Sequence, residues 1–194
     1  MSKLTIGIIL GSTRPGRKGD QVASWVLAQA ATRTEAKYEL IDLADFALPH
    51  LDEAMPASMG QYANDHTKAW AEKISGFDGF VFVTPEYNHS TSGALKNALD
   101  YLYQEWNNKA AAFVSYGGGG GMRAVEHLRL IVGELQMADV RAQVAFSLHT
   151  DFESYTTLTP GPQHAAGLAT LFDQLESWSG ALRTVREPAE ELAA

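Results

Sequence analysis

Short apolar runs alternate along the chain with segments in which apolar residues recur every three to four positions. Bounded apolar runs of this length predict β-strands, and the three- to four-residue period predicts amphipathic helices. The predicted strands are Ile6–Leu10, Tyr38–Asp42, Phe80–Thr84, Ala111–Tyr116 and Val140–Phe146. The predicted helices are about Gly19–Thr32, Tyr62–Ser75, Ser92–Trp106, Met122–Gln136 and Gln163–Leu182, the last with an apolar stripe of Leu168, Leu171, Leu175, Trp178 and Leu182.

Strict alternation of strands and helices predicts a three-layer α/β fold with a doubly wound parallel sheet and right-handed crossovers. Five strands favour the flavodoxin-like order 2-1-3-4-5, with ligands at the carboxyl ends of the strands. We expect residues 1–186 to form a single domain and the acidic tail 187–194 to be frayed. The segment Ala44–Gly60 is expected to be a long irregular loop, either functional or mobile.

Charge and composition exclude several classes of function. Fifteen basic against 23 acidic residues give a net charge of −8, which argues against nucleic acid or an anionic membrane as a partner. Cysteine is absent, so disulfides, thiolate nucleophiles and Cys-ligated metals are excluded. The six histidines show no metal-binding spacing, and no apolar run is long enough to span a membrane. We therefore expect a cytoplasmic protein without a metal, whose redox chemistry, if any, requires a bound cofactor.

The loop after the first strand has the features of a phosphate site. Ser12, Thr13 and Arg14 precede a predicted helix, whose free amides and dipole favour an anion. Three of the 15 basic residues fall within the five positions from Arg14 to Lys18. The spacing matches neither a Walker A loop nor the dinucleotide fingerprint, so a terminal monophosphate fits best. The alternative is a solvated basic turn.

The loop after the third strand begins with Pro85, which ends the strand in a rigid turn. Backbone amides of this turn are expected to point into the crevice, while Tyr87 and Asn88 suit a flat heterocycle. Alternatively, Tyr87 is an exposed loop aromatic, and Glu86 caps the helix that begins just beyond the turn. The residues favour this capping role for Glu86.

Five consecutive glycines, Gly117–Gly121, follow the fourth strand. Glycine permits positive φ and close approach of a ligand ring to the backbone. A flexible linker is the alternative, but this run joins a buried strand directly to a helix. We therefore favour a binding wall over a linker.

Three motifs together resemble the NAD(P)H-dependent FMN reductase family, which includes quinone, azo-dye and chromate reductases. They are Gly11-Ser12-Thr13-Arg14, the Pro85-Glu86-Tyr87-Asn88 turn with Ser92–Asp100 behind it, and Ser115-Tyr116-Gly117-Gly118. The resemblance implies bound FMN, hydride transfer from NAD(P)H, and a quinone, azo, metal-oxyanion or flavin acceptor. It requires no acid–base dyad, so no catalytic side chain is expected.

The resemblance also implies a set of cofactor-binding residues. The phosphate would be held by Ser12, Arg14, Asp20, Gln21 and Val22 through side chains or amides. The ring would be lined by Pro85, Glu86, Tyr87 and Asn88 on one side and by Ser115, Tyr116, Gly117 and Gly118 on the other. Many relatives carry serine or threonine where Lys18, Gly19 or Asp20 stands here, which leaves open the residue that completes the cradle.

Two other functions are compatible with these residues: a flavodoxin-type electron carrier, and a binding module without flavin. Arg14 in the phosphate loop and the open glycine wall favour the reductase. Tyr101 and Tyr103 are expected to project away from the apolar face of their helix, which suggests a homodimer or tetramer.

Overall fold

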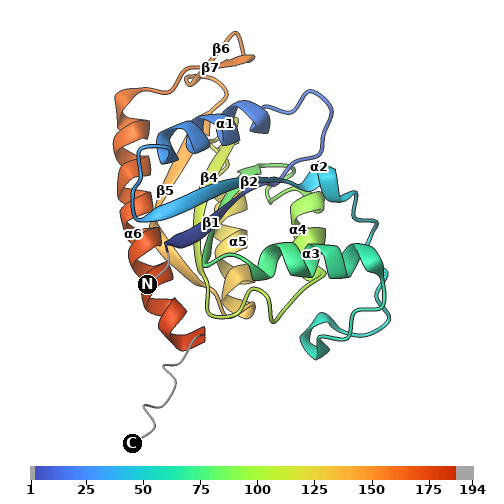
Figure 1. The fold of residues 1–194 in the computed structure, drawn as a ribbon. Coiled ribbons are helices and arrows are strands. Elements are labelled where there is room, and N and C mark those ends of the chain that lie inside the picture. The colour runs from blue at the N-terminus through green and yellow to red at the C-terminus, as the bar shows by residue number, and fades with distance from the viewer. Residues whose placement is uncertain (1–2, 187–194) are drawn as a thin grey trace, which may run out of the picture.

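A computed structural model describes residues 3–186 of the chain. Its main sheet has five parallel strands: β1 (Leu4–Leu10), β2 (Ala36–Asp42), β3 (Gly79–Pro85), β4 (Ala110–Gly117) and β5 (Ala138–Ser147). The strand order is β2-β1-β3-β4-β5, which confirms the predicted doubly wound topology. A small antiparallel hairpin, β6 (Phe152–Glu153) and β7 (Thr157–Leu158), follows β5 (Figure 1).

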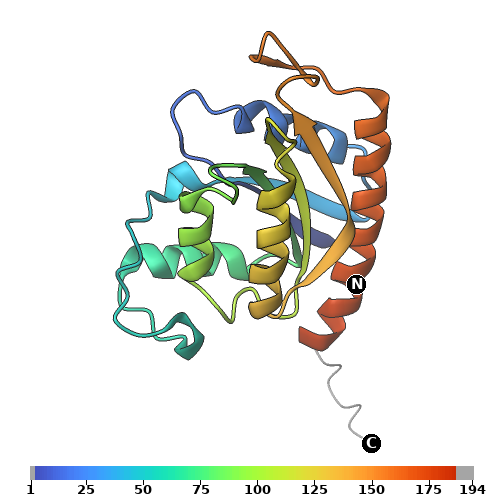
Figure 2. The same cartoon turned by 180° about the vertical axis from the view of Figure 1, so that it is seen from behind.

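Helices cover both faces of the sheet (Figures 1 and 2). One face packs against α1 (Gly19–Ala30) and α6 (Pro162–Arg186). The other packs against α3 (Asp65–Ser75), α4 (Gly93–Asp100) and α5 (Met122–Glu134). The central strands β3 and β4 are buried along their whole length, as expected for strands covered on both faces. No helix within residues 3–186 is both long and apolar enough to cross a membrane.

Helix α4 is shorter than the sequence predicts, because indole groups take its last carbonyls. The prediction extended it to Trp106, but it ends at Asp100. Trp106 Nε1 donates to the carbonyl of Leu99 at 3.2 Å, and Trp70 Nε1 donates to that of Ala98 at 2.9 Å. The chain then turns back so that Trp106 is fully buried. Its apolar period came from this return of the chain rather than from a longer helix.

Two further side-chain predictions were wrong. Tyr101 does not project from the surface: it is fully buried, while Tyr103 is half-buried, so the two tyrosines form no exposed aromatic face. Trp178 does not belong to the buried stripe of α6, since it is 46% exposed. That stripe runs through Leu168, Leu171, Phe172 and Leu175. The segment 44–60 includes two short helices, α2 (Leu43–Phe46) and the 3-10 turn Ala57–Met59, and the expected frayed tail lies outside the described residues.

Candidate functional site

Three loops meet at the carboxyl end of the sheet: the phosphate loop 11–18, the turn 85–90 and the glycine loop 117–121. Backbone bonds fix their relative positions. The amide of Gly11 donates to the carbonyl of Val83 at 2.9 Å, and that of Glu86 donates to the carbonyl of Tyr116 at 3.1 Å. Ser92 Oγ, which caps α4, also donates to the carbonyl of Gly11. The topology therefore unites the three predicted motifs at one edge.

The phosphate loop presents unpaired donors. Ser12 is fully buried, and its amide and that of Thr13 donate to no protein acceptor within residues 3–186. The first amides of α1 lie at the positive end of a helix dipole, where an anion is stabilised. Arg14 is exposed and forms no ion pair with any described residue. These donors fit a phosphate group.

Arg17, in contrast, stabilises the loop itself. Its guanidinium contacts Asp42 through two nitrogens, one of them at 2.8 Å, and its Nε donates to Asp20 at 2.8 Å. It also contacts the carbonyl of Ser12. The hydrogen bond that Arg17 donates to the Asp42 carboxylate raises the pKa of Arg17, although burial opposes the shift. Of the basic cluster predicted from the sequence, Arg17 is thus engaged within the protein, whereas the Arg14 guanidinium has no such partner among residues 3–186.

The remaining predicted phosphate residues are engaged in different ways. The carboxylate of Asp20 pairs with Arg17, so only its amide could face an anion. Gln21 directs its side chain to the β6–β7 hairpin, and Val22 is buried in the core. The amides of Gln21 and Val22 both donate to the carbonyl of Lys18. The geometry therefore leaves no side chain or amide of Gln21 or Val22 directed at a phosphate.

The absence of a side chain at Gly19 allows helix α1 to pack closely against Tyr116. A Cβ at this position would lie 2.7 Å from the hydroxyl oxygen of Tyr116 and 2.6 Å from Leu10 Cδ1. The Tyr116 hydroxyl is buried beside Ser12 and forms no hydrogen bond of normal geometry with the described residues. Only glycine lets helix α1 approach this ring so closely. A serine or threonine at position 19 would place its Cβ against Tyr116 and Leu10, which explains why this position carries glycine here.

Tyr87 connects the turn to the phosphate loop. Its hydroxyl lies 3.0 Å from Ser12 Oγ, although the residues are 75 positions apart. The sequence suggested that its ring presents a flat face to a ligand, with an exposed loop aromatic as the alternative. The ring is only half-buried, and its polar end contacts the phosphate loop. Tyr87 therefore spans the two predicted sub-sites.

The turn after β3 leaves two amides without an acceptor among the described residues. Pro85 ends β3 and pairs with Tyr116 on β4. The amide of Tyr87 donates to the carbonyl of Ser90 at 2.9 Å, so it is not available to a ligand. Asn88 and His89 follow with φ of 48° and 76°, and their amides donate to no acceptor within residues 3–186. Successive amides in a left-handed turn favour electronegative atoms. This places the available donors at Asn88 and His89.

Glu86 does act as a helix cap, but on a different helix from the one expected. Its carboxylate accepts a hydrogen bond from the amide of Arg123 at 3.1 Å, at the start of α5, and pairs with the Arg123 guanidinium. Burial would raise the pKa of Glu86, but these hydrogen bonds outweigh it and hold the pKa below its usual value. The side chain thus ties the turn to the helix that follows the glycine loop.

The glycine loop is an ordered connection. Ser115 Oγ donates to the carbonyl of Gly120 at 2.7 Å, and the amide of Gly120 donates to that of Gly117 at 3.1 Å. Gly120 and Gly121 both have φ of 75°, and a Cβ at Gly121 would lie 2.9 Å from the nitrogen of Tyr116. Gly118 is exposed at the mouth of the site. The run is therefore a tight turn with one open face.

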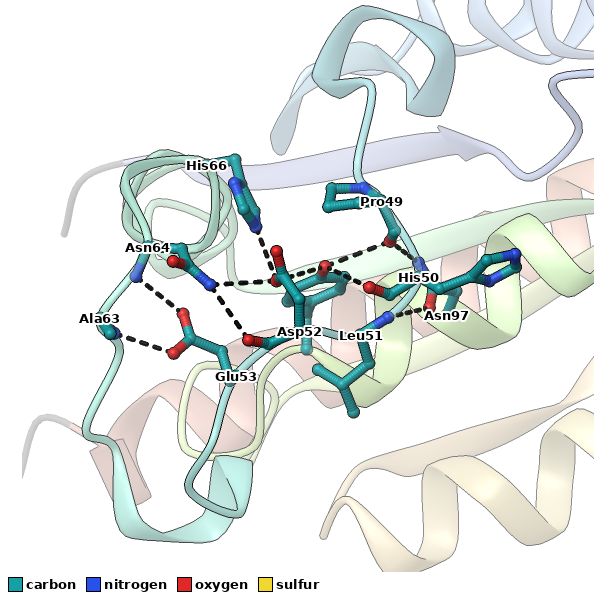
Figure 3. Close-up of polar contacts among 10 residues, drawn as sticks. Pro49, His50, Leu51, Asp52, Glu53, Ala63, Asn64, His66 and Asn97 are labelled. Atoms are coloured by element: carbon teal, nitrogen blue, oxygen red, sulfur yellow. Dashed lines mark hydrogen bonds and ion pairs between the residues drawn. The ribbon is translucent and has the colours of Figure 1, made fainter.

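A cavity of about 310 Å³ lies beside the phosphate loop. It is lined by Thr13, Leu43, Ala44, Ala47, Leu48, Ala94, Asn97 and Ala98. The long loop after α2 forms one wall and helix α4 the other. Asn97 joins these walls, since its Nδ2 donates to the carbonyl of Pro49 at 2.7 Å and its Oδ1 accepts from the amide of Leu51 at 3.0 Å (Figure 3).

Asp52 holds the same loop to α3 and α4. Its carboxylate accepts from the hydroxyl of Tyr101 at 2.9 Å and from Asn64 Nδ2 at 3.0 Å, and it lies 2.9 Å from His66 Nε2 (Figure 3). Beside it, Glu53 accepts from the amides of Ala63 and Asn64. The hydrogen bond from His66 lowers the pKa of Asp52. The sequence suggested that this loop is either mobile or functional. Its many hydrogen bonds argue against mobility.

Sequence reasoning missed three residues at this edge. Arg123 and Asn97 act through partners 37 and 46 residues away in the chain, and no local pattern predicts such pairs. His149, just after β5, has its Nε2 3.6 Å from the position of a Cβ at Gly118. Its place at the end of a strand was the signal that could have indicated it.

The fold and the three loops define a doubly wound α/β protein with a site for a flat, phosphorylated ligand at its topological switch point. The family described as NADPH-dependent FMN reductase matches residues 4–151, and the chain belongs to it.

Individual relatives agree with this assignment. An NAD(P)H-dependent FMN reductase of Schizosaccharomyces pombe is 44% identical over 146 residues, covering 74% of this chain and 73% of the relative. A quinone reductase of Escherichia coli K12 is 36% identical over 140 residues, covering 67% and 70%. The flavoenzyme NAD(P)H:(acceptor) oxidoreductase FerB of Paracoccus denitrificans has the same fold, with a TM-score of 0.73, 21% identity, and coverage of 92% of this chain and 98% of its own.

Proposed function

We propose that this protein is an NAD(P)H-dependent FMN oxidoreductase that passes electrons to a quinone, azo compound, metal oxyanion or flavin. The observation that carries the proposal is the junction of Ser12 and Tyr87. The Ser12 and Tyr87 hydroxyl oxygens lie 3.0 Å apart. They join the loop whose unpaired hydrogen-bond donors would hold a phosphate to the turn that would receive the ring. When bound, FMN supplies the chemistry by accepting a hydride from a nicotinamide and giving electrons to an acceptor. The residues of this chain bind the cofactor and orient it.

In this proposal the phosphate is held by Ser12, Arg14 and the first amides of α1. The Asn88 and His89 amides donate to the polar edge of the ring, where negative charge is best stabilised by fixed donors. Tyr116 and the glycine loop form the opposite wall, with Gly118 open to the incoming substrate. The proposal treats residues 1–186 as one FMN-binding domain, since α6 packs in the same core cluster as α1 and β1.

Spectroscopy of the purified protein tests this function. We expect a yellow protein, or uptake of added FMN, and anaerobic bleaching of the flavin when NADPH or NADH is mixed in a stopped-flow instrument. Comparing the two nucleotides gives the preferred donor. An oxidised spectrum that persists with both nucleotides would support an electron carrier instead. A protein that takes up no FMN would support a binding module.

We also propose that the protein assembles as a homodimer or tetramer through the groove between α4 and α5, two helices that cover the same face of the sheet (Figure 2). The groove measures about 490 Å³ and is lined by Lys96, His127, Leu130 and Ile131 among others. Leu130 is 77% exposed, and Leu51, on the loop bonded to α4, is 48% exposed. A second copy would cover both apolar side chains. Because the groove adjoins the 85–90 turn, a symmetric partner would also shield the proposed flavin site.

Sedimentation tests the assembly. We expect the wild-type protein to sediment as a dimer or larger species, and Leu130→Glu to sediment as a monomer. Val185→Glu, at an exposed apolar position on α6, is the matched control and should leave the assembly unchanged. A monomeric wild-type protein, or a Leu130→Glu variant of unchanged size, would contradict this interface.

The partners in this proposal are a nicotinamide nucleotide and a small electron acceptor. The net charge of −8 is the reason for expecting neither nucleic acid nor an anionic membrane. We propose a cytoplasmic location because the reaction requires reduced nicotinamide nucleotide. Fractionation of cells that express the tagged chain tests the location.

A further inference from the structure

The β6–β7 hairpin stands above the carboxyl end of the sheet (Figure 1), and all of it lies beyond residue 151, where the family match ends. At its tip Tyr155 is 58% exposed, although the element that carries it is anchored. Nothing in the proposed cofactor site accounts for this side chain.

The hairpin is firmly held on α1. Gln21 Nε2 donates to the carbonyl of Thr156 at 2.7 Å, and Gln21 Oε1 accepts from the amide of Leu158 at 2.8 Å. Phe152 is buried in the core beneath the hairpin, and the amide of Thr159 donates to the carbonyl of Asp151 at 2.9 Å. The position of Tyr155 is therefore set by contacts on both sides of the tip.

The tip itself has an unfavourable backbone conformation. Ser154 and Tyr155 have φ of 50° and 58°, a left-handed conformation that side-chain-bearing residues rarely adopt. Positive φ at consecutive central residues is typical of tight β-hairpin turns, and the amide of Thr156 donates to the carbonyl of Glu153 at 2.9 Å across this one. Here the conformation directs the Tyr155 hydroxyl to His149 Nδ1 at 3.1 Å, with ring centroids 5.5 Å apart and planes at 85°.

His149 connects this pair to the proposed flavin site. Its Nε2 lies 3.6 Å from the position of a Cβ at Gly118, the exposed glycine at the mouth of the glycine loop. The neighbouring amide of Leu148 donates to the carbonyl of Gly117 at 2.9 Å, and Ser147 Oγ donates to that of Gly118 at 3.4 Å. Because Tyr155 engages Nδ1, Nε2 is the ring nitrogen left for a ligand.

We propose that Tyr155 and His149 form a lip over the glycine loop that binds a flat aromatic ring of a reaction substrate. The face of Tyr155 would stack on the ring, and His149 Nε2 would hydrogen-bond to its polar edge. The adenine of the nicotinamide nucleotide and an aromatic acceptor both offer this chemistry. The inference rests on the proposed function, since it assigns a substrate contact to that site.

Variants of Tyr155 test the lip in the FMN-loaded protein. For Tyr155→Ala we expect a roughly tenfold weaker interaction with the ring-bearing ligand, the usual loss on removing an aromatic stacking partner, with kcat and FMN affinity unchanged. Tyr155→Phe keeps the ring and should remain within about twofold of wild type. Trp178→Ala, at an exposed aromatic on α6, is the control.

Two sets of ligands distinguish the sources of the ring. If adenine binds, Tyr155→Ala raises the Kd for 5′-AMP, measured by calorimetry, and the KM for NADPH. If an aromatic acceptor binds, Tyr155→Ala raises the KM for menadione and leaves the KM for ferricyanide unchanged. A Tyr155→Ala variant within twofold of wild type in all four quantities would overturn the lip. Failure of the wild-type flavin to be reduced would instead overturn the proposed function, while binding of 5′-AMP would still test the lip.

Discussion

The carboxylate of Glu86 accepts a hydrogen bond from the amide of Arg123 at 3.1 Å, which joins the turn after β3 to the first residues of α5. The side chain is only 7% exposed, so its negative charge is stabilised by the helix end and by the Arg123 guanidinium. Glu86 is therefore a positioning residue that keeps the turn against the glycine loop.

Removing this cap should loosen the proposed flavin site. For Glu86→Ala we expect a loss of about 1–2 kcal/mol in the free energy of unfolding and weaker FMN binding, because the α5 amide is left without its acceptor. Glu86→Gln keeps a capping oxygen and should recover most of both quantities. Urea unfolding of the apoprotein and FMN titration measure them. Equal FMN affinities in all three proteins would argue against a positioning role.

The two arginines of the phosphate loop should separate binding from stability. Arg14→Ala should weaken FMN binding by roughly tenfold or more and leave stability unchanged, since Arg14 forms no ion pair with the described residues. Arg17→Ala should lower stability by about 1–3 kcal/mol, because it leaves Asp42 without its guanidinium. Riboflavin, which lacks the phosphate, serves as the control ligand. Arg14→Ala should bind riboflavin as the wild-type protein does.

The end of α6 is tied to the sheet by a buried carboxylate. Asp78 accepts from Arg183 Nε at 2.9 Å, from Arg186 at 2.5 Å and from the amide of Thr5 at 2.8 Å. We expect Asp78→Asn to cost about 3 kcal/mol of unfolding free energy, because it removes a buried carboxylate to which both guanidinium groups are bound. Asp100→Asn, in the exposed pair with Lys96, should cost about 0.5 kcal/mol or less. Comparable losses in the two variants would contradict this account.

Asp78 should also contribute to acid unfolding. Burial is the largest single influence and would raise its pKa, but the hydrogen bonds from Arg183 and the Thr5 amide, together with the charges of Arg183 and Arg186, outweigh burial and hold the pKa below its ordinary value of 3.8. The stability contributed by this carboxylate is therefore complete above pH 3.8 and is lost as the pH falls below that value. Between pH 5 and pH 3, Asp78→Asn should show a shallower decline than the wild-type protein.

Lys109 should make stability depend on pH in the alkaline range. It directly precedes β4 and is only 4% exposed, and burial lowers its pKa from 10.5 to about 7. Between these values the unfolded chain binds more protons than the folded one, so this group makes the protein more stable as pH rises from about 7 towards 10.5. Urea unfolding at pH 7 and pH 9 should show the rise, and Lys109→Met should remove it. A variant with an unchanged pH slope would contradict the assignment to Lys109.

The network around Asp52 should control access to the long loop 47–64. For Asp52→Asn we expect faster proteolytic cleavage within this loop, because the carboxylate joins His66, Tyr101 and Asn64 (Figure 3). Asp65→Asn, in an exposed pair with Lys68, is the control and should be cleaved at the wild-type rate. Timed digestion with mass spectrometry locates the cuts. Cuts confined to other loops would show that Asp52 does not hold the segment.

The order of the main elements, the strand topology and the loops that carry the proposed site could be predicted from the sequence alone. Apolar periodicity is local, and parallel strands linked by helices have few possible arrangements. The same reasoning located Ser12, Arg14 and the 85–88 turn at one edge, since motifs after parallel strands meet there.

Which of these side chains a ligand can reach depends instead on the folded structure. Arg17 and Gln21 lie among the phosphate-loop residues, but their partners are Asp42 and the β6–β7 hairpin. Glu86 caps α5 rather than α4 because the carboxylate meets Arg123 across the sheet edge. The stop of α4 and the burial of Tyr101 likewise depend on Trp106 and Asp52. These outcomes are set by long-range contacts, for which local periodicity carries no information.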